Sequence, residues 1–133
     1  MEKFAFILHP LSLQDMEHLS PLMRYIPDPI IEACLKMKKP FKVSHITGIK
    51  SPYAEAEGWF IGCPLTAKQM VELPEEFVMD RIIESGKVAQ ELGAKIVGLG
   101  AFTSIVGDAG ITVAKNLDIA VTSGNSYTVA TAI

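Results

Sequence analysis

The residues between Lys95 and Thr128 constrain the fold of this chain most strongly. KIVGLGAFTSI is an apolar run that opens into a turn with small and hydroxyl-bearing side chains, and DIAVTSGNS repeats this pattern further along the chain. Short apolar runs of this kind are typical of strands that are buried on both faces of a sheet. In open α/β sheets, ligands bind outside the carboxyl ends of the strands. The two strand ends therefore predict a binding site in an α/β domain.

Composition and charge narrow the class of protein. Apolar residues make up 49% and charged residues 20% of the 133 residues, which predicts one domain with an extra face to bury against another domain or a partner. The net charge of −3, without a basic stripe, argues against nucleic-acid binding. The opening MEKFAFILHP is too short an apolar run for a signal peptide or a membrane span. We therefore expect a cytoplasmic protein without a membrane span.

Apolar periodicity predicts the elements along the chain. A first strand at residues 4–8, buried on both faces, ends at His9-Pro10 because proline cannot donate to a strand ladder. Strands at 41–49 and 59–61 are expected to pair antiparallel. A long helix from Pro74 to Gly93 leads directly into a strand at 96–99, a step typical of α/β layers. Shorter helices are expected at residues 30–38 and directly after Thr66. A further helix is indicated by the loosely spaced apolar residues Leu13, Met16, Leu19 and Met23. The predicted fold is an α/β three-layer domain with a mixed, mostly parallel sheet.

The last residues, TVATAI, read as an apolar helix that has hardly begun where the chain stops. Domains usually close such a helix with a basic residue or glycine. We therefore expect residues 1–133 to be one domain of a longer protein. Sequencing the coding DNA past the codon for Ile133 tests this expectation.

The glycines of GLGAFT invite comparison with a dinucleotide-binding loop. That loop needs G-x-G-x-x-G or A, a following helix and a later acidic residue at a strand end. Here Thr103 takes the third small position, and Asp118 lies in a polar turn. We expect no cofactor-binding residue in this chain. Saturable NADPH binding that is weakened by Gly100→Val would indicate the alternative, a nucleotide bound at this loop. Close packing at a strand end, or a substrate or domain-interface loop, remain the alternatives for these glycines.

The two strand ends carry neutral hydrogen-bonding side chains. Thr103, Ser104, Ser123 and Asn125 can orient a carbonyl or hydroxyl group without adding charge, which suits substrate positioning. Alternatively, Ser123 and Asn125 only cap a helix. His9 is either an acid/base or a hydrogen-bonded structural histidine.

The sequence predicts neither a metal site nor a catalytic residue in this chain. No histidine shows metal-ligand spacing, and Cys34 and Cys63 form no CxxC pair, so neither zinc nor a disulfide is expected. Cys63 reads as a buried structural thiol, because no basic setting that would activate it is visible.

The motifs GAFTSI and TSGNSYT resemble the N-terminal domain of the long-chain acyl-[acyl-carrier-protein] reductases, whose relatives are often described as amino-acid dehydrogenases. Weaker likeness covers the HP-L-S opening at His9, HITG at His45 and GCPL at Gly62. The resemblance implies a substrate-side domain that precedes a Rossmann domain, which binds NADPH or NADH and carries the nucleophilic cysteine. By this resemblance the whole enzyme would reduce an acyl thioester to an aldehyde.

The architecture of that family is also similar to that of shikimate dehydrogenases, which carry N-x-T-x-P-x-K at the same turn. Thr103 keeps the threonine, but Ala101, Ile105 and Gly107 replace the asparagine, proline and lysine. The loss of these polar anchors argues against a small polar acid and favours an apolar acyl substrate.

We therefore expect the substrate-binding half of an NAD(P)H-dependent oxidoreductase that is inactive without its other domain. The substrate-binding residues are expected to be His9, Phe102, Thr103, Ser104, Ser123, Gly124 and Asn125. The expected partners are an acyl thioester or another small-molecule substrate, an acyl carrier protein and a second copy of the chain. The alternatives are a dehydrogenase domain for a small amino-acid-like or hydroxy acid, and a stand-alone ligand-binding or interaction module.

Overall fold

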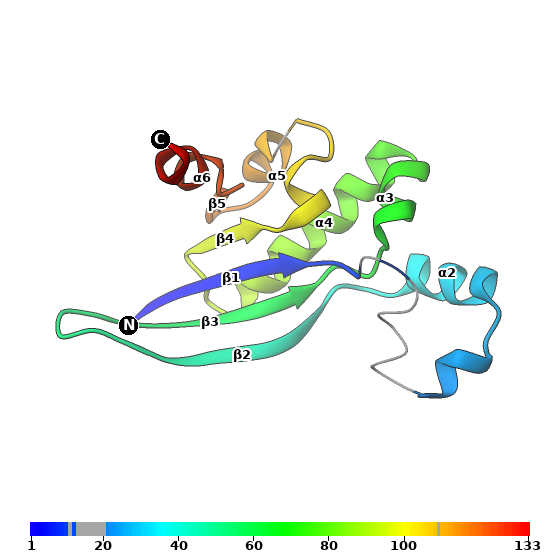
Figure 1. Cartoon of the computed structure of the whole chain (residues 1–133), viewed down its shortest axis with the longest axis horizontal. Coiled ribbons are helices and arrows are strands. Elements are labelled where there is room, and N and C mark those ends of the chain that lie inside the picture. The colour runs from blue at the N-terminus through cyan, green and yellow to red at the C-terminus, as the bar shows by residue number, and fades with distance from the viewer. Residues whose placement is uncertain (11, 13–20, 109) are drawn as a thin grey trace.

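Five strands form a single mixed sheet in the computed structural model, which describes residues 1–10, 12, 21–108 and 110–133 (Figure 1). The order across the sheet is β2-β3-β1-β4-β5. β1 pairs parallel with β3 and β4, β4 pairs parallel with β5, and β2 runs antiparallel to β3. The strands are β1 (Glu2–Leu8), β2 (Phe41–Lys50), β3 (Glu55–Gly62), β4 (Ile96–Leu99) and β5 (Ala120–Thr122). The predicted mixed, mostly parallel sheet and the antiparallel edge pair are confirmed.

Helices lie around this sheet, which is consistent with the predicted three-layer α/β domain. α4 (Glu75–Glu91) crosses one face of the sheet, with α3 (Ala67–Glu72) and α5 (Ile111–Lys115) beside it (Figure 1). α2 (Asp28–Met37) and the 3-10 helix η1 (Pro21–Tyr25) lie near the end of the sheet where β1 and β3 finish (Figure 1). The 3-10 helix η2 (Ala101–Ser104) follows β4, and α6 (Asn125–Ala132) follows β5.

The main core lies between α4 and the sheet. Ile7, Ile61 and Val97 from the three central strands are fully buried, and Val78 and Ile82 of α4 pack against them. This is the helix that the periodicity of residues 74–93 predicts, and its apolar positions are the ones that meet the strands. Burying such side chains is the main driving force for forming this layer.

The opposite face of the sheet differs from the prediction that β1 is buried on both sides. Exposure alternates along β1, and the side chains of Phe6 and Leu8 remain 38% and 37% exposed. The neighbouring strands carry glycine at the facing positions, and Phe6 lies across Gly98 and Gly100, where an added Cβ would come within 2.6 Å of its ring. The sequence shows only an apolar run. The two glycines let the Phe6 ring lie close against their backbone.

Several local predictions differ in their details. α2 begins at Asp28 rather than at residue 30, because Pro29 fits the first turn of a helix. Thr66 caps α3 as predicted, through a reciprocal capping box with Gln69. The stripe of Leu13, Met16 and Leu19 lies outside the described residues, and the structure assigns Met23 to η1.

Candidate functional site

The order in which the parallel strands are added to the sheet reverses between β1 and β4. Along the chain they follow the order β1, β3, β4, β5, but β3 lies on one side of β1 and β4 on the other. Ligands of open α/β sheets bind outside the carboxyl ends of the strands where the order reverses. His9 follows β1 and η2 follows β4, so the fold places both at this switch point.

His9 bridges the two strand ends. Its Nδ1–H donates to the carbonyl oxygen of Pro10 at 3.0 Å, and its Nε2 accepts the backbone N–H of Phe102 at 3.1 Å. Its ring also meets the ring of Phe102 edge-on, with 5.9 Å between the centroids. Both ring nitrogens take part in hydrogen bonds, as expected of a structural histidine, and the acid/base role stays a prediction.

The turn after β4 is held by its own side chains. The Thr103 hydroxyl is buried and donates to the carbonyl oxygen of Gly100 at 2.6 Å, and the half-buried Ser104 donates to that of Ala101 at 2.7 Å. Ala101 itself has φ +48°, in the left-handed region that usually takes glycine. The turn that presents the Phe102 N–H to His9 is therefore strained at Ala101 and stabilised by Thr103.

The three residues predicted at the end of β5 lie at the same edge of the sheet, since β5 pairs with β4. Ser123 is half-buried, whereas Gly124 and Asn125 are exposed. Within the described part of the chain, no hydrogen bond joins them to His9 or η2. The alternative that Ser123 or Asn125 caps α6 is wrong, because Gly124 at φ +78° occupies the N-cap and no side chain caps the helix.

Sequence reasoning missed an apolar cavity that lies beside the switch point, at the ends of β1 and β3. We call it the α2 cavity, and it has a volume of about 220 Å³. It is lined by Leu8, His9, Pro10, Leu35, Lys38, Phe41, Val43, Gly62, Cys63 and Pro64. One signal points to it in the sequence, because His9-Pro10 and Cys63-Pro64 end two strands that prove to be parallel neighbours.

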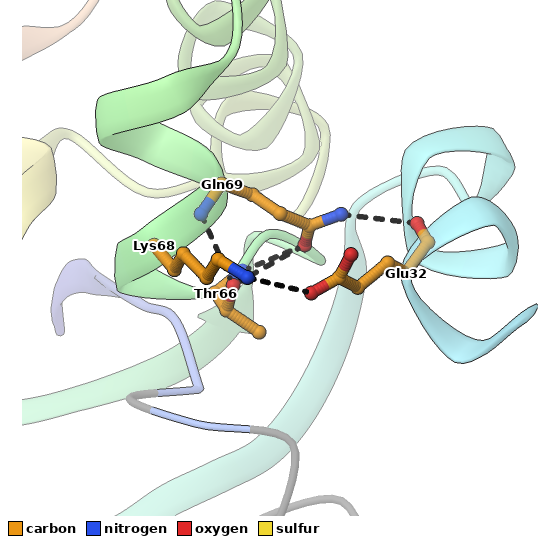
Figure 2. Close-up of polar contacts among 4 residues, drawn as sticks. All are labelled: Glu32, Thr66, Lys68 and Gln69. Carbon is orange, nitrogen blue, oxygen red and sulfur yellow. Dashed lines mark hydrogen bonds and ion pairs between the residues drawn. The ribbon is translucent and has the colours of Figure 1, made fainter. Parts of the chain in front are cut away.

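Two long-range hydrogen bonds hold α2 as the wall of this cavity. The Gln69 side chain on α3 donates to the carbonyl oxygen of Glu32 at 3.0 Å, and the Arg81 guanidinium on α4 donates to that of Lys36 at 2.6 Å. Figure 2 shows the first of these contacts, with Gln69 reaching from its capping box with Thr66 to α2. Leu35 is buried on the inner side of α2.

The two cysteines differ in burial and therefore in reactivity. Cys63 is fully buried, as predicted, and burial raises the pKa of its thiol to about 11. At neutral pH the thiol stays protonated, and the thiolate is the nucleophilic form. Cys34 is exposed on α2.

Among the described residues, no group of three His, Cys, Asp or Glu side chains is placed to hold a metal ion. Nor does any helix in these residues combine the length and the apolar character needed to cross a bilayer.

The chain has a partial likeness to a known protein. No family model matches the chain. Aminotransferase PigE of Serratia sp. is 38% identical to it over 87 residues, which are 65% of this chain but 10% of the aminotransferase. The chain therefore spans about a tenth of the length of this curated relative. The aligned segment is one part of a protein long enough for several domains.

Proposed function

We propose that this chain is the substrate-binding domain of a cytoplasmic NAD(P)H-dependent oxidoreductase that reduces an acyl thioester to an aldehyde. The observation that carries the proposal is the α2 cavity, an apolar space that opens beside the switch point of the sheet. His9 lines the cavity and also bonds to η2, so it joins the space for an apolar chain to the turn at β4.

The chemistry at the turn favours a thioester over a small polar acid. Phe102 and Ser104 are partly exposed there, and Ala101, Ile105 and Gly107 offer no charge to a carboxylate. A neutral, polar edge beside an apolar cavity suits an acyl chain with its carbonyl at the turn. Coenzyme A and acyl carrier protein are the two carriers of such a thioester.

Reduction would require a second domain. The turn after β4 leads into the short 3-10 helix η2 rather than an α-helix whose N-terminus could receive a pyrophosphate, so this turn does not suit a nicotinamide cofactor. Cys63 is buried and protonated and does not serve as the nucleophile. We therefore expect the purified 133-residue chain to oxidise no NADPH, and a clear NADPH-dependent rate with an acyl thioester would contradict this division of roles.

The binding step can be tested on this chain alone. Titration with octanoyl-N-acetylcysteamine, followed by the backbone amide signals in NMR, is expected to shift Leu8, Leu35 and Cys63. Val43→Trp places a bulky ring at the half-exposed rim and should weaken binding at least tenfold. Ile49→Trp is the matched control, since Ile49 is similarly exposed on the same strand but does not line the cavity. Absence of binding, or equal weakening by both variants, would overturn the proposal.

The likeness to part of an aminotransferase favours a second candidate, in which the same cavity holds the chain of an apolar aldehyde or ketone that accepts an amino group. Titration with octanal and with the octanoyl thioester separates the two. Tighter binding of the thioester supports the reductase, and tighter binding of the aldehyde supports amino transfer.

A further inference from the structure

We propose that the α2 cavity selects acyl chains of about eight carbons and that Lys38 binds an anionic group at the head of the ligand. This inference rests on the proposed function and names the substrate class of the same site. The proposed chain is shorter than the long acyl chains that the resemblance implies, and the charge of the head group is a point on which the resemblance says nothing.

The volume of the cavity sets the chain length. A cavity of about 150 Å³ holds the six carbons of benzene. By that comparison, the α2 cavity of about 220 Å³ holds roughly eight or nine carbons. A longer chain would have to extend into solvent or displace α2.

The walls resist such displacement. Leu35 forms the α2 side of the cavity and is only 3% exposed. Its helix is fastened on both sides of Leu35, by Gln69 at the carbonyl of Glu32 and by Arg81 at the carbonyl of Lys36. Because both bonds reach the backbone, α2 cannot move outward without breaking them. The two bonds therefore hold α2 in place as one wall of the cavity.

The rim of the α2 cavity carries one charged side chain, that of Lys38, and the walls are largely apolar. Lys38 lines the cavity from the C-cap of α2, and its Nζ lies 4.4 Å from the centroid of the Phe41 ring. None of the ion pairs within the described residues involves Lys38. The ammonium group is held over the aromatic face and remains exposed to solvent, so it can meet an anion on a bound ligand.

A series of straight-chain carboxylates from C4 to C14, kept below their micellar concentrations, tests the chain length in NMR titrations. Each added methylene that is buried should strengthen binding about fourfold. We expect this gain to continue to about C8 and then to stop. A gain that continues through C14, or no dependence on length, would overturn the proposed length selection.

Variants test the walls and the charge separately. Val43→Trp should move the end of the gain to a shorter chain, and Ile49→Trp should leave it at C8. Lys38→Gln should weaken octanoate about fivefold and leave the neutral ligand octanol unchanged, with Lys115→Gln on α5 as the control. Equal affinity of Lys38→Gln and wild type for octanoate would overturn the role of Lys38.

The same titrations show whether the anion is a carrier phosphate or a free carboxylate. They also distinguish a failure of the proposed function from a failure of the chain-length and charge proposals. Octanoyl-coenzyme A binding more tightly than octanoate, with the difference lost in Lys38→Gln, supports a phosphate on a carrier, and the reverse order supports a free carboxylate. If octanol and the neutral octanoyl thioester also fail to bind, the proposed function itself is wrong. If they bind but the length or charge dependence is absent, only the further inference is wrong.

Discussion

At the scale of single residues, the turn after β4 combines one strained residue with one that stabilises it. Ala101 takes a backbone conformation that costs a non-glycine residue about 1–2 kcal/mol. The buried hydroxyl of Thr103 closes the same turn on Gly100. Strain of this kind persists only where the surroundings enforce it. Here the hydrogen bond from the Phe102 N–H to His9 helps to hold Ala101 in this conformation.

Thr103→Ala is expected to lower the free energy of unfolding by about 1 kcal/mol, because it removes the buried hydrogen bond to Gly100. Thr103→Ser keeps the hydroxyl and should retain most of that stability. Ser104→Ala should change it by less than about 0.5 kcal/mol, since Ser104 is more accessible. Urea denaturation of the three variants checks the order. Equal losses in Thr103→Ala and Ser104→Ala would show that Thr103 does not stabilise the turn.

Ala101→Gly is expected to stabilise the protein by roughly 0.5 kcal/mol, as relief of the left-handed strain outweighs the added entropy of the unfolded chain. Ala114→Gly on α5 is the matched control, because this alanine is also exposed but lies in a helix. There glycine should cost up to about 1 kcal/mol. The midpoints of urea unfolding measure both. A loss of stability in Ala101→Gly similar to that in Ala114→Gly would contradict the strain at this position.

At the scale of elements, α2 depends on side chains from other helices. Gln69 completes the capping box of α3 through Thr66 and also donates to α2, so a single side chain joins two helices (Figure 2). The ion pair between Lys68 and Glu32 spans the same gap at 3.8 Å, but exposed pairs contribute little.

Gln69→Ala is therefore expected to cost roughly 1–3 kcal/mol, because it leaves the buried Thr66 N–H and the Glu32 carbonyl without this partner. Hydrogen exchange of the α2 amides should accelerate more than that of α4. Lys68→Ala, at the adjacent position, should change the free energy of unfolding, measured by urea denaturation, by less than about 0.5 kcal/mol. Unchanged exchange in α2 of Gln69→Ala would show that this contact does not hold the helix.

The β2–β3 pair carries a contact that responds to acid. The Glu57 carboxylate lies 2.9 Å from Nε2 of His45 and 3.5 Å from Nζ of Lys3, and the ring of His45 stacks on Trp59. The hydrogen bond with His45 is the main reason that the pKa of Glu57 lies below its usual value, and Lys3 adds to the effect.

Because the pKa of Glu57 is lower in the folded protein, its contribution to stability is present above the unfolded-state pKa near 4.5 and is lost as pH falls through the folded-state pKa. Glu57→Gln should therefore lose less stability than wild type on acidification from pH 6 to pH 3. Urea unfolding at several pH values measures the two slopes. Identical slopes would mean that Glu57 does not couple folding to protons in this range.

At the scale of the whole molecule, the sequence predicts those helices, strands and caps that depend on residues close together in the chain. The helix at 75–91, the strand at 96–99 and the cap at Thr66 follow from periodicity and capping residues that stand close together in the chain. The α2 cavity does not follow from such signals. His9 meets Phe102 across 93 positions, and Arg81 meets Lys36 across 45. Contacts of this kind depend on the strand order, which no local pattern in one sequence specifies.

The same long-range packing predicts how the two thiols react. Cys34 is exposed on α2, whereas Cys63 is fully buried in the core and its thiol has a pKa of about 11. Iodoacetamide at pH 8 should modify Cys34 quickly and Cys63 only when the domain opens. In Cys34→Ser, the remaining modification should therefore accelerate with urea in parallel with global unfolding. The raised pKa also implies that the contribution of Cys63 to stability is lost as pH rises from about 9 towards 11, because ionisation favours the unfolded chain. Modification of Cys63 in Cys34→Ser at a rate independent of urea would show that the chain opens locally around Cys63, without unfolding of the core between α4 and the sheet.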